Sequence, residues 1–496
     1  RRRRMAPAAR HASLLLPALS ISLLRLASLG APAAADSPGL HAQDAALAAS
    51  LAADDECGAG PGLALDERCV LNVLQLRHQK RATSDRREGA LAWTNASGHA
   101  DADESEVLAL SDPATIQSYV QGKGYPFEVH YVTTGDGLRL ALFRLPRPGA
   151  PPVHLQHGLM DSAWAWVFPG EGFKALAFQI YDAGYDVWLG NNRGNLFSLH
   201  WANGKYAGDD RAFWDFSFDQ MGRYDVPAFT TAVIEKTGWP KLAYVGHSQG
   251  TTQMFIAASL PELKPNVSDR ISVFVALSPV AWLGHMKSPL FVALARGYIE
   301  QLAWPLFPHG RLLTGSTTRG VFSMICMATF GVLCSISVAS TVGTGLLDLP
   351  NAVTDEADKF PYGTSFKNLI HFAQGVRDRQ FRKYDYGAQN MEKYGQATPP
   401  SYNVTRDAGV PIALLNGQYD MLCAYEDIGI LRKAMPPAAI VFDKDYPRFS
   451  HLTWMLGSGE AAPYVADVLT LLRKYQPLNE TVGNATAATG NASVAD

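Results

Sequence analysis

The sequence contains few charged residues for its length. Only 18% of its 496 residues are charged and the net charge is −3, so the charge balance gives no reason to expect a nucleic acid partner. By contrast, 47% of the residues are hydrophobic, which is enough for a sizeable core. A chain of this length can form one large domain with additions, or two to three domains.

Cysteines are also scarce. The five are Cys57, Cys69, Cys326, Cys334 and Cys423. In an oxidising compartment the local pairings are Cys326 with Cys334 and Cys57 with Cys69. Cys423 is then left over, and we expect it to be a free thiol.

Residues 36–112 lack any pattern that would build a core. Alanine, glycine and acidic residues dominate first, followed by a basic run at Arg77–Arg87 that contains the pair Lys80-Arg81. We predict a low-complexity, disordered extension or a pro-segment that is cut at the dibasic pair. The alternative is a small module held by a disulfide between Cys57 and Cys69.

Residues 1–35 have the features of a secretion signal. Arg10 supplies a basic start, Ser13–Leu29 is mostly apolar, and Ala33–Ala35 offers a small-residue cleavage site. We expect the signal to be cleaved rather than to remain as an anchor, because Arg25 interrupts the apolar run. The chain is therefore expected to enter the secretory pathway and to be secreted or to reach the lysosomal or vacuolar lumen.

Six N-x-S/T sequons agree with this route. Three of them fall in the last 18 residues, so we predict that residues 477–496 form a glycosylated, disordered tail. The candidate glycosylation sites are Asn95, Asn266, Asn403, Asn479, Asn484 and Asn491.

Strand patterns alternate with helix patterns over residues 113–279 and again over residues 403–476. The strand patterns cover Phe127–Thr134, Leu138–Leu145, Pro151–Gln156, Tyr185–Leu189, Lys241–Val245, Ile271–Leu277, Val410–Leu415 and Ala439–Phe442. The helix patterns cover Gly172–Gly184, Asp225–Thr237, Thr251–Leu260 and Ala462–Tyr475, with Asp225 as a cap and Pro227 in the first turn of the second. This order predicts an α/β core, in two parts, with a largely parallel sheet flanked by helices.

Residues 280–402 interrupt the alternation. The segment is rich in helix patterns and aromatic residues, and 28 consecutive uncharged residues lie between Arg319 and Asp348. That run is long enough to cross a bilayer. Its many Ser, Thr and Gly residues and its two cysteines favour a different interpretation, an inserted apolar cap over a lipid site, and we expect no transmembrane span after the signal is removed.

One stretch carries the pattern of a catalytic nucleophile. Gly246–Gly250 reads G-H-S-Q-G, preceded by a strand pattern and followed by a helix pattern. A serine on such a strand-to-helix turn holds its hydroxyl clear of the backbone when small residues flank it. Ser248 is therefore the candidate nucleophile. The alternative is a tight glycine turn that happens to carry a serine.

A serine nucleophile needs a histidine base and a carboxylate that orients it, and the α/β-hydrolase chain order is Ser, acid, His. Asp420 follows a late strand pattern and His451 follows the last one. Two backbone amides must also stabilise the oxyanion, and Gln249 and Leu159 are the candidates. No metal or cofactor is expected. The alternative acids are Glu426, Asp427, Asp443 and Asp445.

These stretches together resemble the acid lipase family, the gastric and lysosomal acid lipases with their plant and microbial relatives. The similarity spans roughly residues 112–476. The matching stretches are LQHGL at Leu155–Leu159, DAGYDVWLGNNRGN at Asp182–Asn195, FWDFSFDQMGRYDVPA at Phe213–Ala228, YVGHSQGTT at Tyr244–Thr252, FPYGTSFKNLIHFAQ at Phe360–Gln374 and NGQYD at Asn416–Asp420.

The resemblance implies an α/β-hydrolase fold with an inserted, mobile cap, and Ser248, Asp420 and His451 as the triad. Cys326 and Cys334 lie where the family's cap carries cysteines, which is consistent with a disulfide. The long N-terminal extension and the sequon-rich tail are departures from the family.

Three functions follow as hypotheses. The first is a serine lipase that hydrolyses neutral lipid esters, triacylglycerols or sterol esters, through an acyl-enzyme at a lipid–water interface. The second is a carboxylesterase for smaller soluble esters. The third is a catalytically inactive lipid-binding homologue. The sequence leaves open the choice between triacylglycerol and sterol ester, the pH optimum and the oligomeric state.

Overall fold

The computed structural model describes residue 107 and residues 111–168, 174–263, 266–298, 307–314, 361–404, 409–457 and 462–478. Several predictions therefore fall outside the described residues: the signal, almost all of the extension, the tail from residue 479 onward and the uncharged run at 320–347. The same holds for the two cysteine pairs and for four of the six sequons. The boundaries proposed between core, cap and tail stay predictions.

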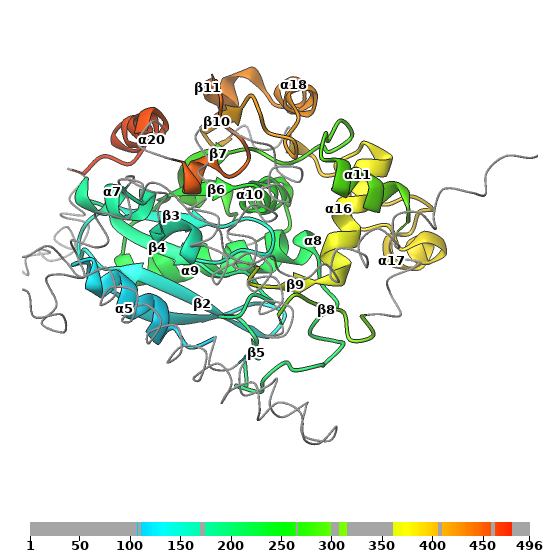
Figure 1. Ribbon diagram of the computed structural model, residues 1–496, viewed down its shortest axis with the longest axis horizontal. Helices are drawn as coiled ribbons and strands as arrows, with labels where there is room; N and C mark the ends of the chain where they lie inside the picture. The colour runs from blue at the N-terminus through cyan, green and yellow to red at the C-terminus, as the bar shows by residue number, and fades with distance from the viewer. Residues whose placement is uncertain are drawn as a thin grey trace, which may run out of the picture. The chain divides into compact units, whose positions relative to one another are not determined.

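A nine-stranded, mostly parallel sheet forms the framework (Figure 1). Its order is β1-β2-β4-β3-β6-β7-β10-β11, with β5 paired to β2. The parallel pairs run from β4 to β11, whereas β1, β2 and β5 join antiparallel at one side. The strands are β1 (Glu128–Thr133), β2 (Leu138–Leu145), β3 (Pro152–Gln156), β4 (Asp186–Gly190), β5 (His200–Trp201), β6 (Leu242–His247), β7 (Ile271–Leu277), β10 (Ile412–Gly417) and β11 (Ile440–Tyr446).

Helices flank this sheet, as the alternating pattern predicts. Helix α7 packs with α20, and α9 packs with α10. In Figure 1, β3 and β4 lie between α7 and α9. Strands β2, β3, β4, β6, β7 and β10 are almost wholly buried because helices cover them. The core helices are α5 (Ala114–Gly122), α6 (Trp164–Val167), α7 (Leu176–Asp182), α8 (Phe218–Gln220), α9 (Val226–Thr237), α10 (Gln249–Ser259), α18 (Tyr425–Ala434), α19 (Thr453–Leu456) and α20 (Ala462–Tyr475).

One predicted helix start is different in the structure. Asp225 stands at the cap position of α9, but its side chain makes no capping hydrogen bond. Its carboxylate instead accepts from Arg193 Nε at 2.8 Å and from the Arg193 amide at 3.2 Å. The chain arrives through α8 and a π-helical turn, η2 (Met221–Asp225), and Ser217 caps α8 with a capping box. The Asp225 carboxylate therefore binds the buried Arg193 and does not cap the helix.

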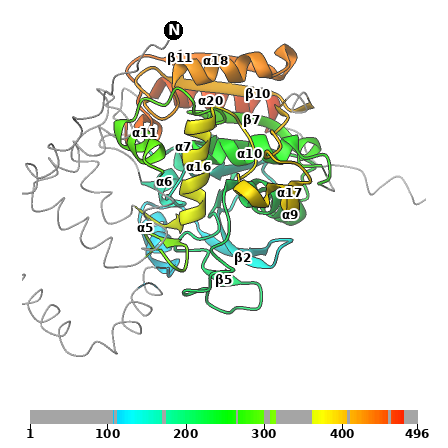
Figure 2. The ribbon, with the colours of Figure 1, turned by 90° about the vertical axis from the view of Figure 1, so that its right-hand side faces the viewer.

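Between β7 and β10 the described residues contain helices and a small sheet. They are α11 (Pro289–Arg296), β8 (Arg311–Leu312), β9 (Thr364–Ser365), α16 (Phe366–Asp378) and α17 (Asn390–Tyr394). Helices α11 and α16 pack together, and Figure 2 shows α16 running along this side of the molecule. Among the residues that the structure describes, no helix is long and apolar enough to span a membrane.

Candidate active site

The candidate nucleophile lies on a sharp turn between β6 and α10. Ser248 has φ 52° and ψ −121°, a conformation that costs a non-glycine residue about 1–3 kcal/mol. The flanking glycines leave no space for a side chain. A Cβ at Gly250 would lie 2.3 Å from the carbonyl oxygen of Gln156, and one at Gly246 would lie 2.9 Å from Gly250. The G-x-S-x-G spacing thus follows from close packing, of Gly250 against the end of β3 and of Gly246 against the first turn of α10.

A continuous hydrogen-bond chain joins three of the predicted residues. Ser248 Oγ lies 2.8 Å from His451 Nε2, and His451 Nδ1 lies 2.8 Å from Asp420 Oδ2. All three side chains are buried. Because a carboxylate only accepts, the ring must donate from Nδ1, which leaves Nε2 free to accept the serine proton. This arrangement is able to activate a hydroxyl for attack on a carbonyl.

Asp420 is held by more than the histidine. Its Oδ1 accepts from the amides of Leu422 at 2.9 Å and Cys423 at 2.8 Å. Its Oδ2 also accepts from Ser278 Oγ at 2.6 Å, and Ser278 in turn accepts from Trp454 Nε1 at 2.7 Å. Ser278 lies in no sequence motif. The one sequence feature that points to it is its position directly after β7, at the same edge of the sheet as Ser248 and Asp420.

The four alternative acids are engaged elsewhere. Asp427 pairs with His285 at 2.7 Å, and Glu426 pairs with Lys287 at 3.1 Å. Arg432 binds both Asp443 and Asp445. Asp420 is thus the candidate acid whose carboxylate contacts His451.

The loop after β3 lies against the nucleophile. A Cβ built on Gly158 would lie 3.2 Å from Ser248 Cβ and 3.6 Å from its Oγ. Within the described residues, the amides of Leu159 and Gln249 donate to no protein acceptor. Two unused donors beside the serine fit an oxyanion site.

His157 fixes the shape of this loop. Its Nε2 accepts from the Asn192 amide at 3.1 Å and from Asn195 Nδ2 at 3.2 Å, so its Nδ1 must donate to the Gly158 carbonyl at 2.9 Å. Burial lowers the pKa of His157 to about 4, which keeps the ring neutral. The loop glycine is therefore held from both sides, by His157 and by the turn at Ser248.

A second neutral histidine supports the base. His247 is buried, and its Nε2 donates to the backbone carbonyl of His451 at 2.8 Å. Burial and the nearby His451 keep the pKa of His247 well below its usual value. The residue before the nucleophile thus anchors the loop that carries the base, a role that its place in the motif does not by itself predict.

Of the other predicted residues that the structure describes, Cys423 contacts this centre through its backbone amide, which donates to Asp420. Cys423 is a buried thiol that donates to the Pro279 carbonyl, and it is free in the described part of the chain. Asn266 is half-buried and Asn403 is exposed. Their glycosylation, and that of the other four sequons, stays a prediction, as does the disulfide between Cys326 and Cys334.

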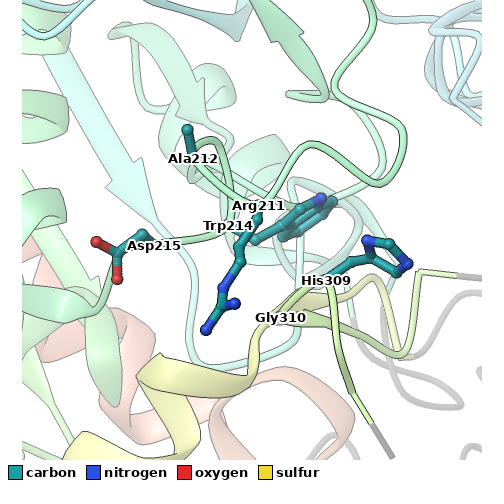
Figure 3. Close-up of a pocket in the computed structure, with 6 residues that line it drawn as sticks. All are labelled: Arg211, Ala212, Trp214, Asp215, His309 and Gly310. Carbon is teal, nitrogen blue, oxygen red and sulfur yellow. The ribbon is translucent and has the colours of Figure 1, made fainter.

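A pocket elsewhere on the chain contains none of the triad residues (Figure 3). Its lining residues are Arg211, Ala212, Trp214, Asp215, His309 and Gly310.

Comparison with known proteins identifies the family. A family model described as the alpha/beta hydrolase fold matches residues 151–310, and a partial alpha/beta-hydrolase lipase region matches residues 116–170. Gastric triacylglycerol lipase from Homo sapiens is 36% identical over 375 residues, which cover 70% of this chain and 88% of the relative. The chain belongs to the acid lipase family.

Two further members of the acid lipase family have similar sequence identity to this chain and similar coverage. Lipase member K from Homo sapiens is 35% identical over 379 residues, covering 73% of this chain and 91% of the relative. Lysosomal acid lipase/cholesteryl ester hydrolase from Homo sapiens is 34% identical over 389 residues, which cover 74% of this chain and 94% of the relative. The family, the α/β-hydrolase fold and the class of enzyme expected from the sequence, a lipase-type carboxylic ester hydrolase, are confirmed.

Proposed function

We propose that this protein hydrolyses neutral lipid esters with Ser248 as nucleophile, His451 as general base and acid, and Asp420 as the group that orients the base. The observation that carries the proposal is the hydrogen-bond chain from Ser248 Oγ through His451 to Asp420, with distances of 2.8 Å at both steps. No cofactor is needed for this chemistry.

The reaction would proceed in two halves. His451 Nε2 takes the proton of Ser248 while the oxygen attacks the ester carbonyl, and the amides of Leu159 and Gln249 stabilise the oxyanion. Collapse breaks the bond to the alcohol, which leaves with the proton from His451, and an acyl-enzyme remains. Water then attacks the acyl group with the same base and releases the fatty acid.

The substrate class is supported by the relatives. Their names specify triacylglycerol and cholesteryl ester, which are both neutral, water-insoluble esters. The uncharged run at 320–347 supports a cap over the site that turns outward at a lipid surface. The words gastric and lysosomal in the relatives' names agree with a secretory route, and we place the mature protein outside the cell or in a lysosomal or vacuolar lumen.

A rate assay across substrates separates this function from a soluble carboxylesterase. Purified protein would be given emulsified triolein, emulsified cholesteryl oleate and a short soluble ester, each between pH 4 and pH 8. We expect a disproportionate rise in rate once a long-chain ester exceeds its solubility limit. Hydrolysis confined to the short ester, with no such rise, would favour the carboxylesterase.

A labelling experiment combined with the rate assay tests the nucleophile. A fluorophosphonate probe should label the wild type, and Ser248→Ala should lose both labelling and ester hydrolysis, because no other oxygen is activated by His451. A wild type that binds lipid but neither labels nor hydrolyses would indicate the inactive homologue. Labelling that survives in Ser248→Ala would place the nucleophile elsewhere.

A further inference from the structure

The side chain of Gln249, the residue after the nucleophile, is tied to two elements outside its own helix. It is 1% exposed. Its Oε1 accepts from Asn368 Nδ2 at 2.6 Å, and its Nε2 donates to Met221 Sδ at 3.3 Å. Asn368 belongs to α16 and Met221 begins η2. The first residue of α10 is thus linked to a helix that lies more than 100 residues away in the sequence.

The orientation of the Asn368 amide is determined by its neighbours. The backbone N–H of Phe218 donates to Asn368 Oδ1 at 2.7 Å, so the oxygen must face that side. Its Nδ2 then faces Gln249 and Thr364 Oγ1, the latter at 3.1 Å. Because Asn368 Nδ2 is a donor, the Gln249 atom that faces it must be the acceptor Oε1, which determines the orientation of the Gln249 side chain as well.

Asn368 itself is held rigidly. It is fully buried, and its backbone amide donates to the capping hydroxyl of Ser365 at 3.0 Å. Ser365 also donates to the Phe216 carbonyl. Because each of these partners is buried, the amide has no water to exchange with and one arrangement is favoured.

From this network we infer that Asn368 is a positioning residue for the oxyanion amide of Gln249. The peptide between Ser248 and Gln249 carries the N–H that would stabilise the oxyanion. The strained turn at Ser248 orients this peptide from its N-terminal side. The Gln249 side chain, held by Asn368, orients the same peptide from its C-terminal side. The inference rests on the proposed function, since it concerns the same reaction.

The clamp affects catalysis more than substrate binding. An oxyanion donor acts on charge that develops in the transition state, so a small displacement lowers turnover while the bound ester is little affected. A misplacement of about 1 Å can cost about 100-fold in rate. A helix from the segment between β7 and β10 thereby determines how well the serine turn performs.

The test compares Asn368→Ala with Thr364→Val, which removes the other acceptor of the same Asn368 Nδ2 and leaves Gln249 in place. Gln249→Met, which keeps the backbone amide but loses both side-chain hydrogen bonds, serves if Asn368→Ala folds poorly. For each protein we would measure kcat and KM on a short soluble ester and the affinity for a trifluoromethyl ketone. That ketone adds the serine oxygen and leaves an oxyanion in the site.

We expect Asn368→Ala and Gln249→Met to lower kcat by about 10- to 100-fold with KM within about twofold, and to weaken ketone binding by the same factor as kcat/KM. Thr364→Val should stay within about threefold of wild type in both measurements. The double variant of Asn368 and Gln249 should be no slower than Gln249→Met alone, because Gln249→Met has already lost the hydrogen bond to Asn368.

A purely structural role predicts a different result. Asn368→Ala would then lose thermal stability while the folded enzyme keeps its kcat and ketone affinity, and this outcome would overturn the inference. Additive losses in the double variant would do so too. Failure of the proposed function is distinguishable, because the wild type itself would then neither hydrolyse the ester nor bind the ketone.

Discussion

At the scale of single residues, Asp420 has the most complete set of partners in the site. It accepts from two backbone amides, from Ser278 and from His451, so each of its oxygens has two donors. A buried carboxylate satisfied in this way has one available geometry. The orientation of the base therefore depends on a network that includes Ser278, directly after β7, and Trp454 in α19.

We predict that Asp420→Asn lowers kcat by about 10⁴-fold, because the amide no longer fixes the tautomer of His451. Asp427→Asn is the matched control, since Asp427 pairs with His285 and not with the triad. Steady-state kinetics on a short soluble ester give both values. If Asp427→Asn loses the activity and Asp420→Asn keeps it within tenfold, the acid has been misassigned.

At the scale of elements, the turn from β6 to α10 depends on glycine. Gly250 packs its α-carbon against the end of β3, where the Gln156 carbonyl would lie 2.3 Å from any added Cβ. In contrast, Gly429 lies within α18 and has open space around it. Glycine is therefore required by close packing at position 250, whereas the space around position 429 would admit a side chain.

We expect Gly250→Ala to lower the free energy of unfolding by roughly 3 kcal/mol or more, because backbone atoms must move to admit the methyl group. Gly429→Ala should raise it by about 1 kcal/mol, as alanine favours a helix interior. Urea unfolding measures both. Equal stability of Gly250→Ala and wild type would mean that the turn is looser than described.

Comparing predicted with observed elements shows which features of the fold and site can be predicted from sequence. Strands β2 and β7 and helix α20 have the predicted bounds, because each has a strong pattern of apolar residues. The chain order of nucleophile, acid and base also follows from sequence. The roles of Ser278, His247 and Asn368 do not, because each depends on a partner brought close only by the fold. The Asn368–Gln249 contact, for example, spans 119 residues.

At the scale of the whole molecule, the fold keeps several histidines neutral in its interior. Burial lowers the pKa of His154 and of His157 to about 4 and that of His371 to about 3. His247 behaves in the same way. In the unfolded chain each would titrate near its ordinary value of about 6.5. Between about pH 4 and pH 6.5 the unfolded state therefore binds more protons than the folded one, and stability falls as the pH falls.

This linkage can be measured with His154→Gln, which keeps a donor for Gln156 but cannot titrate. We predict that the slope of unfolding free energy against pH between pH 4.5 and pH 6 becomes shallower by about 1 kcal/mol per pH unit, because the unfolded state holds most of one extra proton at this residue. Above pH 7.5, where histidine is neutral in both states, wild type and variant should have the same slope. An unchanged slope at acid pH would mean that His154 takes up its proton in the folded protein.

The pairing of β7 with β10 has an evolutionary consequence. These strands are neighbours in the sheet although more than 130 residues separate them, and the residues that form the hydrogen-bond chain come from both sides of that junction. The strand pairing and the triad hydrogen bonds use residues outside the connecting segment, whereas the Asn368–Gln249 hydrogen bond links the serine turn to α16 within it. Descendants of such a gene can therefore lengthen or shorten other parts of the connection and so acquire new substrate ranges, while the contact of α16 with the serine turn constrains its complete replacement.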